Sequence, residues 1–208
     1  MIPTVQQAPL LDVDPATRRA FDYYPTPAWM TLALLRRVQP FDVLEPCAGQ
    51  LAIVNVLRQA PHVGWVESND LDPSTPTDTH CDAARAEYWE ALSRRTHNRP
   101  YWGVTNVPFD LADRIVPLAV TYLPVFATIL RLSWLEPTAA RQRFLAAHPP
   151  AKLIVMPRHD FKGRGSTDSV TSAWFIWERG RSSIGSTPID IVTKDERDEF
   201  VAEQIKIL

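Results

Sequence analysis

The chain has 208 residues, of which 45% are hydrophobic and 22% are charged, and its formal net charge is −2. This length suits one α/β domain with a full core, and the composition excludes wholesale disorder. So small a net charge provides no global attraction to nucleic acid, so positive charge that contacts a polyanion has to be local.

The first residues, Met1–Gln7, carry no basic segment followed by an apolar run, which is the pattern of a secretory signal. No apolar stretch in the chain reaches the roughly 18–20 residues that are needed to span a bilayer. The cysteines, Cys47 and Cys81, fit neither a disulfide framework nor a zinc site. We therefore expect a cytoplasmic protein with reduced thiols, no membrane contact and no metal.

Short apolar runs alternate with helical patterns, which predicts a mostly parallel α/β sheet. In chain order the sequence predicts helix Thr26–Val38, strand Phe41–Leu44, helix Ile53–Gln59, strand Val63–Val66, helix Ala83–Arg95, strand Tyr101–Thr105, helix Ala112–Tyr122, strand Val125–Leu132, helix Thr138–Ala147, and strands Lys152–Met156 and Trp174–Glu178. Thr138 is a good cap for the last of these helices. Neither a repeat nor a linker is visible, so residues 1–208 are expected to form a single domain.

Two further expectations concern the core and the tail. Five tryptophans fit core positions better than exposed ones: Trp29, Trp65, Trp89, Trp174 and Trp177. The charged segment Lys194–Leu208 is expected to be a helix, and its acidic part, Lys194–Glu203, a solvated face.

Polar residues follow several of the predicted strands, where open α/β sheets bind their ligands. Glu45-Pro46-Cys47-Ala48-Gly49 follows the first strand and Asp70 the second. Asp82 lies near a possible further strand, and Asn106-Val107-Pro108-Phe109 follows the strand Tyr101–Thr105. An acidic residue after a strand is by itself more often a helix cap or a solvated turn, but the order of the four segments together indicates a ligand site.

These segments resemble the amino-group DNA methyltransferases of the N6-adenine type, in particular small phage-type members, over about Tyr23–Trp177. Tyr24-Pro25-Thr26-Pro27 resembles the Y-x-T-P segment of that family, Glu45-Pro46-Cys47-Ala48-Gly49 its E/D-P-x-x-G cofactor loop, and Asn106-Val107-Pro108-Phe109 its N/D-P-P-Y/F catalytic loop. Asp70 is similar to the acidic residue that holds the cofactor ribose, and Asp82 to the one that contacts the cofactor adenine.

The resemblance implies a Rossmann-like class I methyltransferase fold, with a mostly parallel seven-stranded sheet and helices on both faces. It also implies S-adenosyl-L-methionine as cofactor and the N6 amino group of adenine in DNA as acceptor. In that scheme Asn106 and a neighbouring backbone carbonyl accept hydrogen bonds from N6, while Phe109 stacks on a base that has left the duplex. No metal is required.

The chain departs from the family pattern at two positions. Leu51 stands where the cofactor loop has a second glycine, and a side chain there would crowd the amino-acid end of the cofactor. Val107 replaces the first proline of the catalytic loop, so it keeps the carbonyl but gains an N–H that needs a partner if it is buried.

The acceptor and its contacts stay open on sequence grounds. Arg158, Lys162 and Arg164, in and beside the polar loop His159–Thr171, fit phosphate contacts as well as they fit a plain surface loop. Two other functions remain: methylation of another planar amino or amide group (protein glutamine or an RNA base), or a catalytically weakened protein that binds DNA or a host protein. The sequence does not give the oligomeric state.

Overall fold

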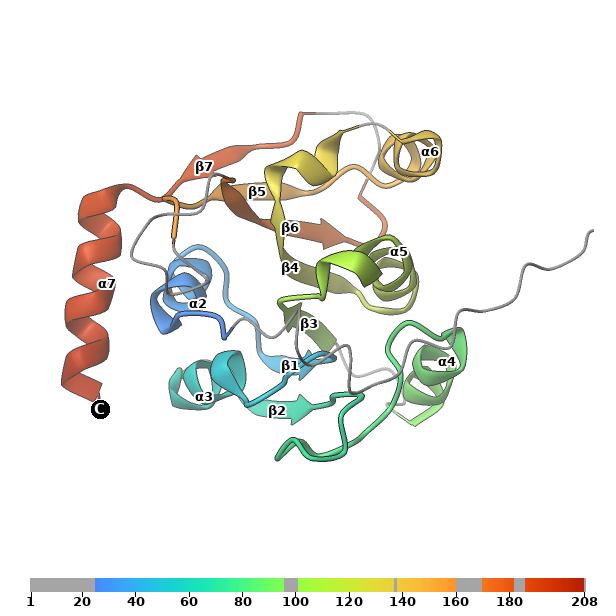
Figure 1. Cartoon of the computed structure of the whole chain (residues 1–208), viewed down its shortest axis with the longest axis horizontal. Coiled ribbons are helices and arrows are strands. Elements are labelled where there is room, and N and C mark those ends of the chain that lie inside the picture. Colours follow the sequence, from blue (N-terminus) through green and yellow to red (C-terminus); the bar gives the residue numbers. More distant parts are fainter. Residues whose placement is uncertain (1–24, 96–100, 137, 160–169, 182–185, 208) are drawn as a thin grey trace, which may run out of the picture.

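Seven strands form one sheet, in the order β2-β1-β3-β4-β6-β5-β7 (Figure 1). The computed structural model describes residues 25–95, 101–136, 138–159, 170–181 and 186–207. The strands are β1 (Asp42–Glu45), β2 (Trp65–Ser68), β3 (Tyr101–Thr105), β4 (Val125–Arg131), β5 (Lys152–Val155), β6 (Ser172–Glu178) and β7 (Ile189–Ile191). The helices are α2 (Ala28–Leu35), α3 (Ala52–Gln59), α4 (Ala86–Arg95), α5 (Ala112–Tyr122), α6 (Ala139–Ala147) and α7 (Lys194–Ile207).

The sheet is mostly parallel, as predicted, and only β6 runs against its neighbours β4 and β5. From β1 the chain moves outward to β2 and then returns to the other side of β1 as β3. The strand order therefore reverses between β1 and β3, which is where open α/β sheets bind ligands. The strand β7 was not predicted, because its three residues, Ile-Asp-Ile, are too short to give an alternating pattern.

The helices cover both faces of the sheet, which confirms the predicted Rossmann-like architecture. One layer contains α2, α3 and α7, and the other contains α4, α5 and α6 (Figure 1). The alternation of side chains along β6 shows this arrangement. Trp174 and Ile176 lie in the core that α2 and α3 cover, whereas Phe175 and Trp177 lie in the core that α4 and α5 cover. A strand that is buried on both faces reads as a continuous apolar run.

Most predicted elements are present, with differences at their ends. The helix α4 begins at Ala86 and not at Ala83, because the Asp82 carboxylate accepts the Ala84 N–H at 2.9 Å and its carbonyl accepts the Arg85 N–H at 3.1 Å. These bonds form a turn ahead of the helix. Thr138 caps α6 as predicted, accepting the Arg141 N–H at 3.2 Å.

The tryptophan predictions hold for four of the five positions, but Trp65 is 43% exposed. It lies on β2, at the edge of the sheet, and packs against the ring of Tyr101. Because β2 has a neighbouring strand on only one side, its apolar side chains can remain partly exposed to solvent. Within the described ranges, no helix combines the length and the apolarity that crossing a bilayer requires.

The C-terminal helix α7 forms as predicted and most of its acidic side chains are exposed, but the helix also packs against α2, a contact that the sequence did not predict. Phe200 of α7 is fully buried in the core beside α2, with the guanidinium of Arg36 over its ring. Thr193 and Glu196 form a capping box, in which each side chain bonds the backbone N–H of the other. Sequence periodicity missed this contact because, among the described side chains of α7, only Phe200 is buried, and it follows a run of charged residues.

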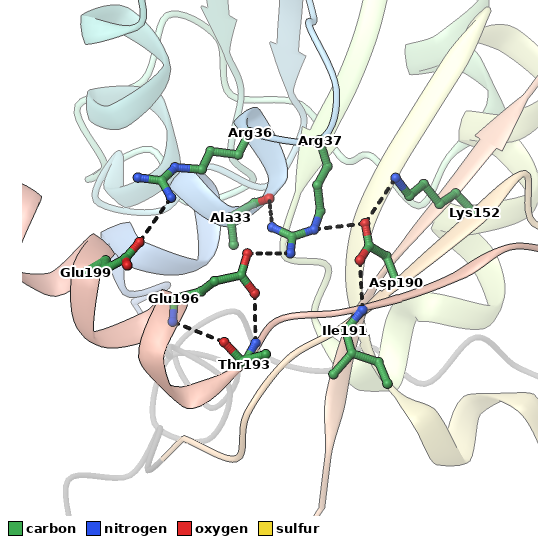
Figure 2. Close-up of polar contacts among 9 residues, drawn as sticks. All are labelled: Ala33, Arg36, Arg37, Lys152, Asp190, Ile191, Thr193, Glu196 and Glu199. Atoms are coloured by element: carbon green, nitrogen blue, oxygen red, sulfur yellow. Dashed lines mark hydrogen bonds and ion pairs between the residues drawn. The ribbon is translucent and has the colours of Figure 1, made fainter.

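Arg37 joins α7 and β7 to α2 through an ion-pair network that Figure 2 shows. Its guanidinium, only 11% exposed, bonds the carboxylates of Asp190 at 3.0 Å and Glu196 at 2.8 Å. Lys152 lies 3.3 Å from the same Asp190 carboxylate. Because one largely buried cation pairs with carboxylates from β7 and from α7, it holds these two elements against α2.

We predict that Arg37→Leu lowers the free energy of unfolding by about 1–3 kcal/mol, because it leaves two charged hydrogen-bond acceptors without their donor. The neighbouring Arg36→Leu is the matched control. Arg36 is 42% exposed and its ion pairs to Glu199 and Glu203 face solvent, so this variant should cost less than about 1 kcal/mol. Urea unfolding at pH 7 measures both, and equal costs would contradict the role given to Arg37.

The cost of Arg37→Leu should also depend on pH. Burial raises the pKa of Asp190, but Arg37 and Lys152 outweigh this effect and hold the pKa below its usual value. The Thr193 N–H and then Arg37 lower the pKa of Glu196. A carboxylate whose pKa is lowered on folding contributes stability above its unfolded pKa and loses it as the pH falls through the folded value. The difference between wild type and Arg37→Leu should therefore be complete at pH 7 and shrink below about pH 4.

Candidate functional site

The loop after β1 forms one wall of the site, and its backbone has a left-handed conformation at two positions. Gly49 has a φ of 49° and Leu51 a φ of 64°, both in the left-handed region. The Gly49 N–H donates to the Asp70 carboxylate at 2.8 Å, and the Leu51 N–H to the Ala48 carbonyl at 2.8 Å. Glycine adopts this conformation without strain, so the position suits a loop that must approach a ligand closely.

Asn69, at the end of β2, is fully buried and ties this loop to the next one. Its Nδ2 donates to the carbonyls of Pro46 at 3.0 Å and Cys81 at 2.9 Å. Its Oδ1 accepts the Thr79 hydroxyl at 2.8 Å and the Cys81 N–H at 2.9 Å. The amide therefore uses both donors and both acceptor positions to join three segments of chain.

Glu45, the last residue of β1, is buried where the loop begins. One carboxylate oxygen accepts the Val54 N–H at 3.0 Å, in the first turn of α3. Burial raises the pKa of this carboxyl well above its usual range, and the nearby Asp70 adds to the effect. A helix N-terminus and a cation are the two partners that would favour its charged form, and among the described residues only the first is present.

Asn106 follows β3 and faces the start of α2. Its Nδ2 donates to the Thr26 hydroxyl at 3.2 Å, which turns the Oδ1 acceptor away from Thr26. The next residue, Val107, is buried, and its N–H donates to the Thr128 hydroxyl of β4 at 3.4 Å. The additional N–H that the valine introduces therefore has a partner, and the loop is held without the proline.

Phe109 continues the same loop as the first residue of a 3-10 turn (Phe109–Leu111). The guanidinium of Arg131, at the end of β4, lies 4.5 Å from the centroid of its ring. This cation–π contact covers one face of the phenyl ring, so only the other face remains for a planar ligand.

Two adjoining cavities, of about 100 and 620 Å³, lie between the walls described above and share Cys47, Gly49, Asp70 and Pro108. The smaller one reaches the loop after β3 and is lined by Pro25, Thr26, Glu45, Cys47, Ala48, Gly49, Ala52, Ile53, Asp70, Asn106, Val107, Pro108 and Phe109. The larger one combines polar residues such as Asp70 and Asp82 with the apolar side chains of Ala83, Leu111 and Ile115.

Carboxylates dominate the charge of these two cavities. Glu45, Asp70, Asp72 and Asp82 line them, and no lysine or arginine does so among the described residues. Burial, together with Asp70 and Glu45, raises the pKa of the Cys47 thiol, so this thiol stays protonated. Across the described part of the chain, no group of three or more His, Cys, Asp and Glu residues could hold a metal. The cavities suit an organic cation.

The structure brings most of the predicted site residues together, with five exceptions. Pro27 lies at the start of α2, outside both cavities, and Arg158 lines a different cavity. Tyr24, Lys162 and Arg164 lie outside the described residues. Leu51 lines neither cavity and packs against the core instead, so it does not crowd this site.

Sequence reasoning missed three residues of this region: Asn69, Thr128 and Arg131. Asn69 had a local signal, because it belongs to the polar run Glu67-Ser68-Asn69-Asp70 that follows the predicted strand Val63–Val66. Thr128 and Arg131 had none, since their contacts depend on the pairing of β4 with β3, which the sequence does not reveal.

No protein-family model matches the chain, and no curated protein matches it by sequence. Solved structures do resemble it. One is described as a modification subunit of a type I restriction enzyme from Vibrio vulnificus, with 12% identity and a TM-score of 0.56, over 93% of this chain and 55% of that one. The chain thus spans about half of that structure.

Two smaller proteins are similar. A class I S-adenosylmethionine-dependent methyltransferase of Listeria monocytogenes has 10% identity and a TM-score of 0.52, over 86% of this chain and 67% of that one. An O-methyltransferase of Bacillus cereus, in complex with SAH, has 11% identity and a TM-score of 0.52, over 82% and 84%. At these identities the likeness shows the fold: the chain has the fold of class I methyltransferases.

We predict that Asn69→Ala lowers the free energy of unfolding by about 2–4 kcal/mol, since it leaves several buried backbone groups without a hydrogen bond. Asn55→Ala, on an exposed position of α3, is the matched control and should change stability by less than about 0.5 kcal/mol. Urea unfolding measures both. Similar values for the two variants would show that Asn69 does not hold the loops together.

Proposed function

We propose that this chain transfers a methyl group from S-adenosyl-L-methionine to the N6 amino group of adenine in DNA. The main support for this proposal is that two features lie together at the point where the strand order reverses. There a cavity lined by carboxylates, with no cationic side chain among the described residues, opens onto the Asn106 amide. The class I methyltransferase fold supports the cofactor, and the resemblance of the loops supports the acceptor.

The cavities fit the cofactor in charge and in shape. S-adenosylmethionine carries a sulfonium and an ammonium group, and the Glu45 carboxyl can pair with such a cation deep in the smaller cavity. Asp70 uses each carboxylate oxygen for one backbone N–H, of Gly49 and of Asp72, and each oxygen has a second lone pair for a ribose hydroxyl. The apolar wall of the larger cavity, facing Asp82, suits an adenine ring.

The residues around Asn106 suit an amino-group acceptor. The cofactor, when bound, supplies an electrophilic methyl group: the N6 lone pair forms the C–N bond as the C–S bond breaks, one N6 proton leaves to solvent, and S-adenosylhomocysteine remains. The N6 lone pair is delocalised into the adenine ring. The Asn106 Oδ1 and a neighbouring backbone carbonyl would accept the two N6 hydrogens and draw the nitrogen towards tetrahedral geometry. The free face of Phe109 would stack on the base.

Two observations favour an active enzyme over a catalytically weakened descendant. The Val107 N–H is bonded to Thr128, so the loop keeps a defined shape without its proline. Leu51 lies against the core and leaves the cofactor cavity open.

The acceptor is tested by incubating the protein with radiolabelled S-adenosylmethionine and DNA, RNA or glutamine-containing protein in parallel. We expect label in DNA, recovered as N6-methyladenine after digestion. Label in RNA or protein, with none in DNA, would replace the acceptor and keep the cofactor.

We predict that the protein binds S-adenosylmethionine and that Asp70→Ala weakens this binding by about 1–3 kcal/mol, the cost of lost hydrogen bonds to the ligand and the loop. Asp110→Ala, on the 3-10 turn outside both cavities, is the matched control and should bind normally. Titration calorimetry measures all three proteins. No heat from wild type at millimolar cofactor would overturn the enzymatic proposal.

We predict that Asn106→Ala abolishes methyl transfer and leaves cofactor affinity within about twofold, because its acceptor acts on the transition state. Asn106→Asp keeps an acceptor oxygen, and the Thr26 hydroxyl can donate to it, so this variant should retain measurable activity. Single-turnover rates, with calorimetry in parallel, separate the two effects. Full activity in Asn106→Ala would move the catalytic contact to another residue.

A further inference from the structure

A third cavity, of about 480 Å³, lies beyond the ends of β5 and β7, away from the cofactor cavities. It is lined by Met156, Pro157, Arg158, Ile191, Val192, Lys194 and Arg197. Three of these side chains are cationic and none is acidic. The chain therefore has two kinds of cavity with opposite charge, although its net charge is only −2.

The three cationic side chains of this cavity contribute little to the stability of the fold. Arg158 and Lys194 are exposed, and Arg197 bonds its neighbour Asp198 at 2.7 Å. Lys194 is the first residue of α7, where the helix dipole disfavours a positive charge. The Thr193–Glu196 capping box already satisfies backbone N–H groups of that helix end. The side chains, and not the helix terminus, are what an anion would bind.

The cavity lies at the same edge of the sheet as the catalytic loop, because β3, β4, β5 and β7 all point the same way. Three strand spacings separate β3 from β5, or about 14 Å. A short series of contacts spans this distance: His159, next to Arg158, packs on Trp29 with 5.9 Å between ring centroids, and Thr26, three residues before Trp29, bonds Asn106.

We propose that Arg158, Lys194 and Arg197 bind a backbone phosphate of the nucleic-acid strand whose base enters the Asn106 pocket. This inference rests on the proposed function. At about 14 Å, the phosphate belongs to a nucleotide that flanks the methylated one, since stacked nucleotides rise 3.4 Å each. Arg158 was a candidate phosphate contact from sequence, whereas Lys194 and Arg197 become candidates only because β7 and α7 pack beside β5.

The test compares two triple variants that remove the same charge. The first is Arg158→Ala, Lys194→Ala, Arg197→Ala. The control is Arg58→Ala, Arg94→Ala, Arg179→Ala, whose residues lie near the end of α3, near the end of α4 and just after the antiparallel strand β6, all at the opposite edge of the sheet. Binding of a fluorescent single-stranded oligodeoxynucleotide is followed by anisotropy from about 0.05 to 0.5 M salt, without cofactor.

Each phosphate contact contributes about −0.7 to the slope of log affinity against log salt on a single strand. Loss of this one phosphate contact should flatten the slope by about 0.7 and weaken binding about fivefold at 0.1 M salt. The control should match wild type, and both variants should keep the wild-type affinity for S-adenosylmethionine. Inorganic phosphate at the same ionic strength should not displace the oligonucleotide, because one phosphate lacks the contacts of a strand.

Equal slopes for the two triple variants would overturn the inference, and so would displacement of the oligonucleotide by inorganic phosphate, which would indicate a site for a small anion. The outcome is independent of methyl transfer, since the binding assay contains no cofactor. A chain that failed to bind S-adenosylmethionine would therefore refute the proposed function and leave the phosphate site to be judged by the salt slopes.

Discussion

The edge of the sheet that contains the candidate site depends on one buried side-chain amide, that of Asn69. Beyond the ends of β1 and β2 the backbone has no strand ladder to satisfy it, and Asn69 takes over that role for the loops on either side. Its backbone contributes as well, because its N–H donates to the Glu45 carbonyl and its carbonyl accepts the Ala48 N–H. An amide has two donors and two acceptor positions on one rigid plane, so no smaller polar side chain could replace all four bonds.

Charge is separated along this edge in the way that the proposed reaction requires. The two cavities beside Asp70 are lined by carboxylates, which would attract a positively charged cofactor, and the cavity at β5 and β7 is lined by cations, which would attract a negatively charged strand. Clefts with low-dielectric walls focus the field of their own lining residues, so each cavity keeps its sign at close range. The net charge of the whole chain is a poor guide to what such a protein binds.

The sequence predicts features that depend on neighbouring residues better than contacts between residues that are far apart in the chain. Strands such as Val125–Arg131, and the polar segments that follow them, are visible because each depends on a few consecutive residues. The docking of α7 through Phe200, and the contact of Arg131 with Phe109, depend on which elements lie side by side. Local sequence patterns do not show which elements lie side by side. For the same reason they do not show that the charged helix α7 lines a cavity.

The packing of α7 on α2 has a consequence for how the chain folds. Arg36 and Glu199 are 163 residues apart, yet they belong to the same layer. Contacts this distant in sequence require a costly loop closure and slow folding. At about 5–20 residues per second, a ribosome needs roughly 8–33 s to make the intervening chain. Throughout that time α2 lacks the contact with Phe200 of α7, so its apolar side stays exposed longer than the elements that fold from neighbouring segments.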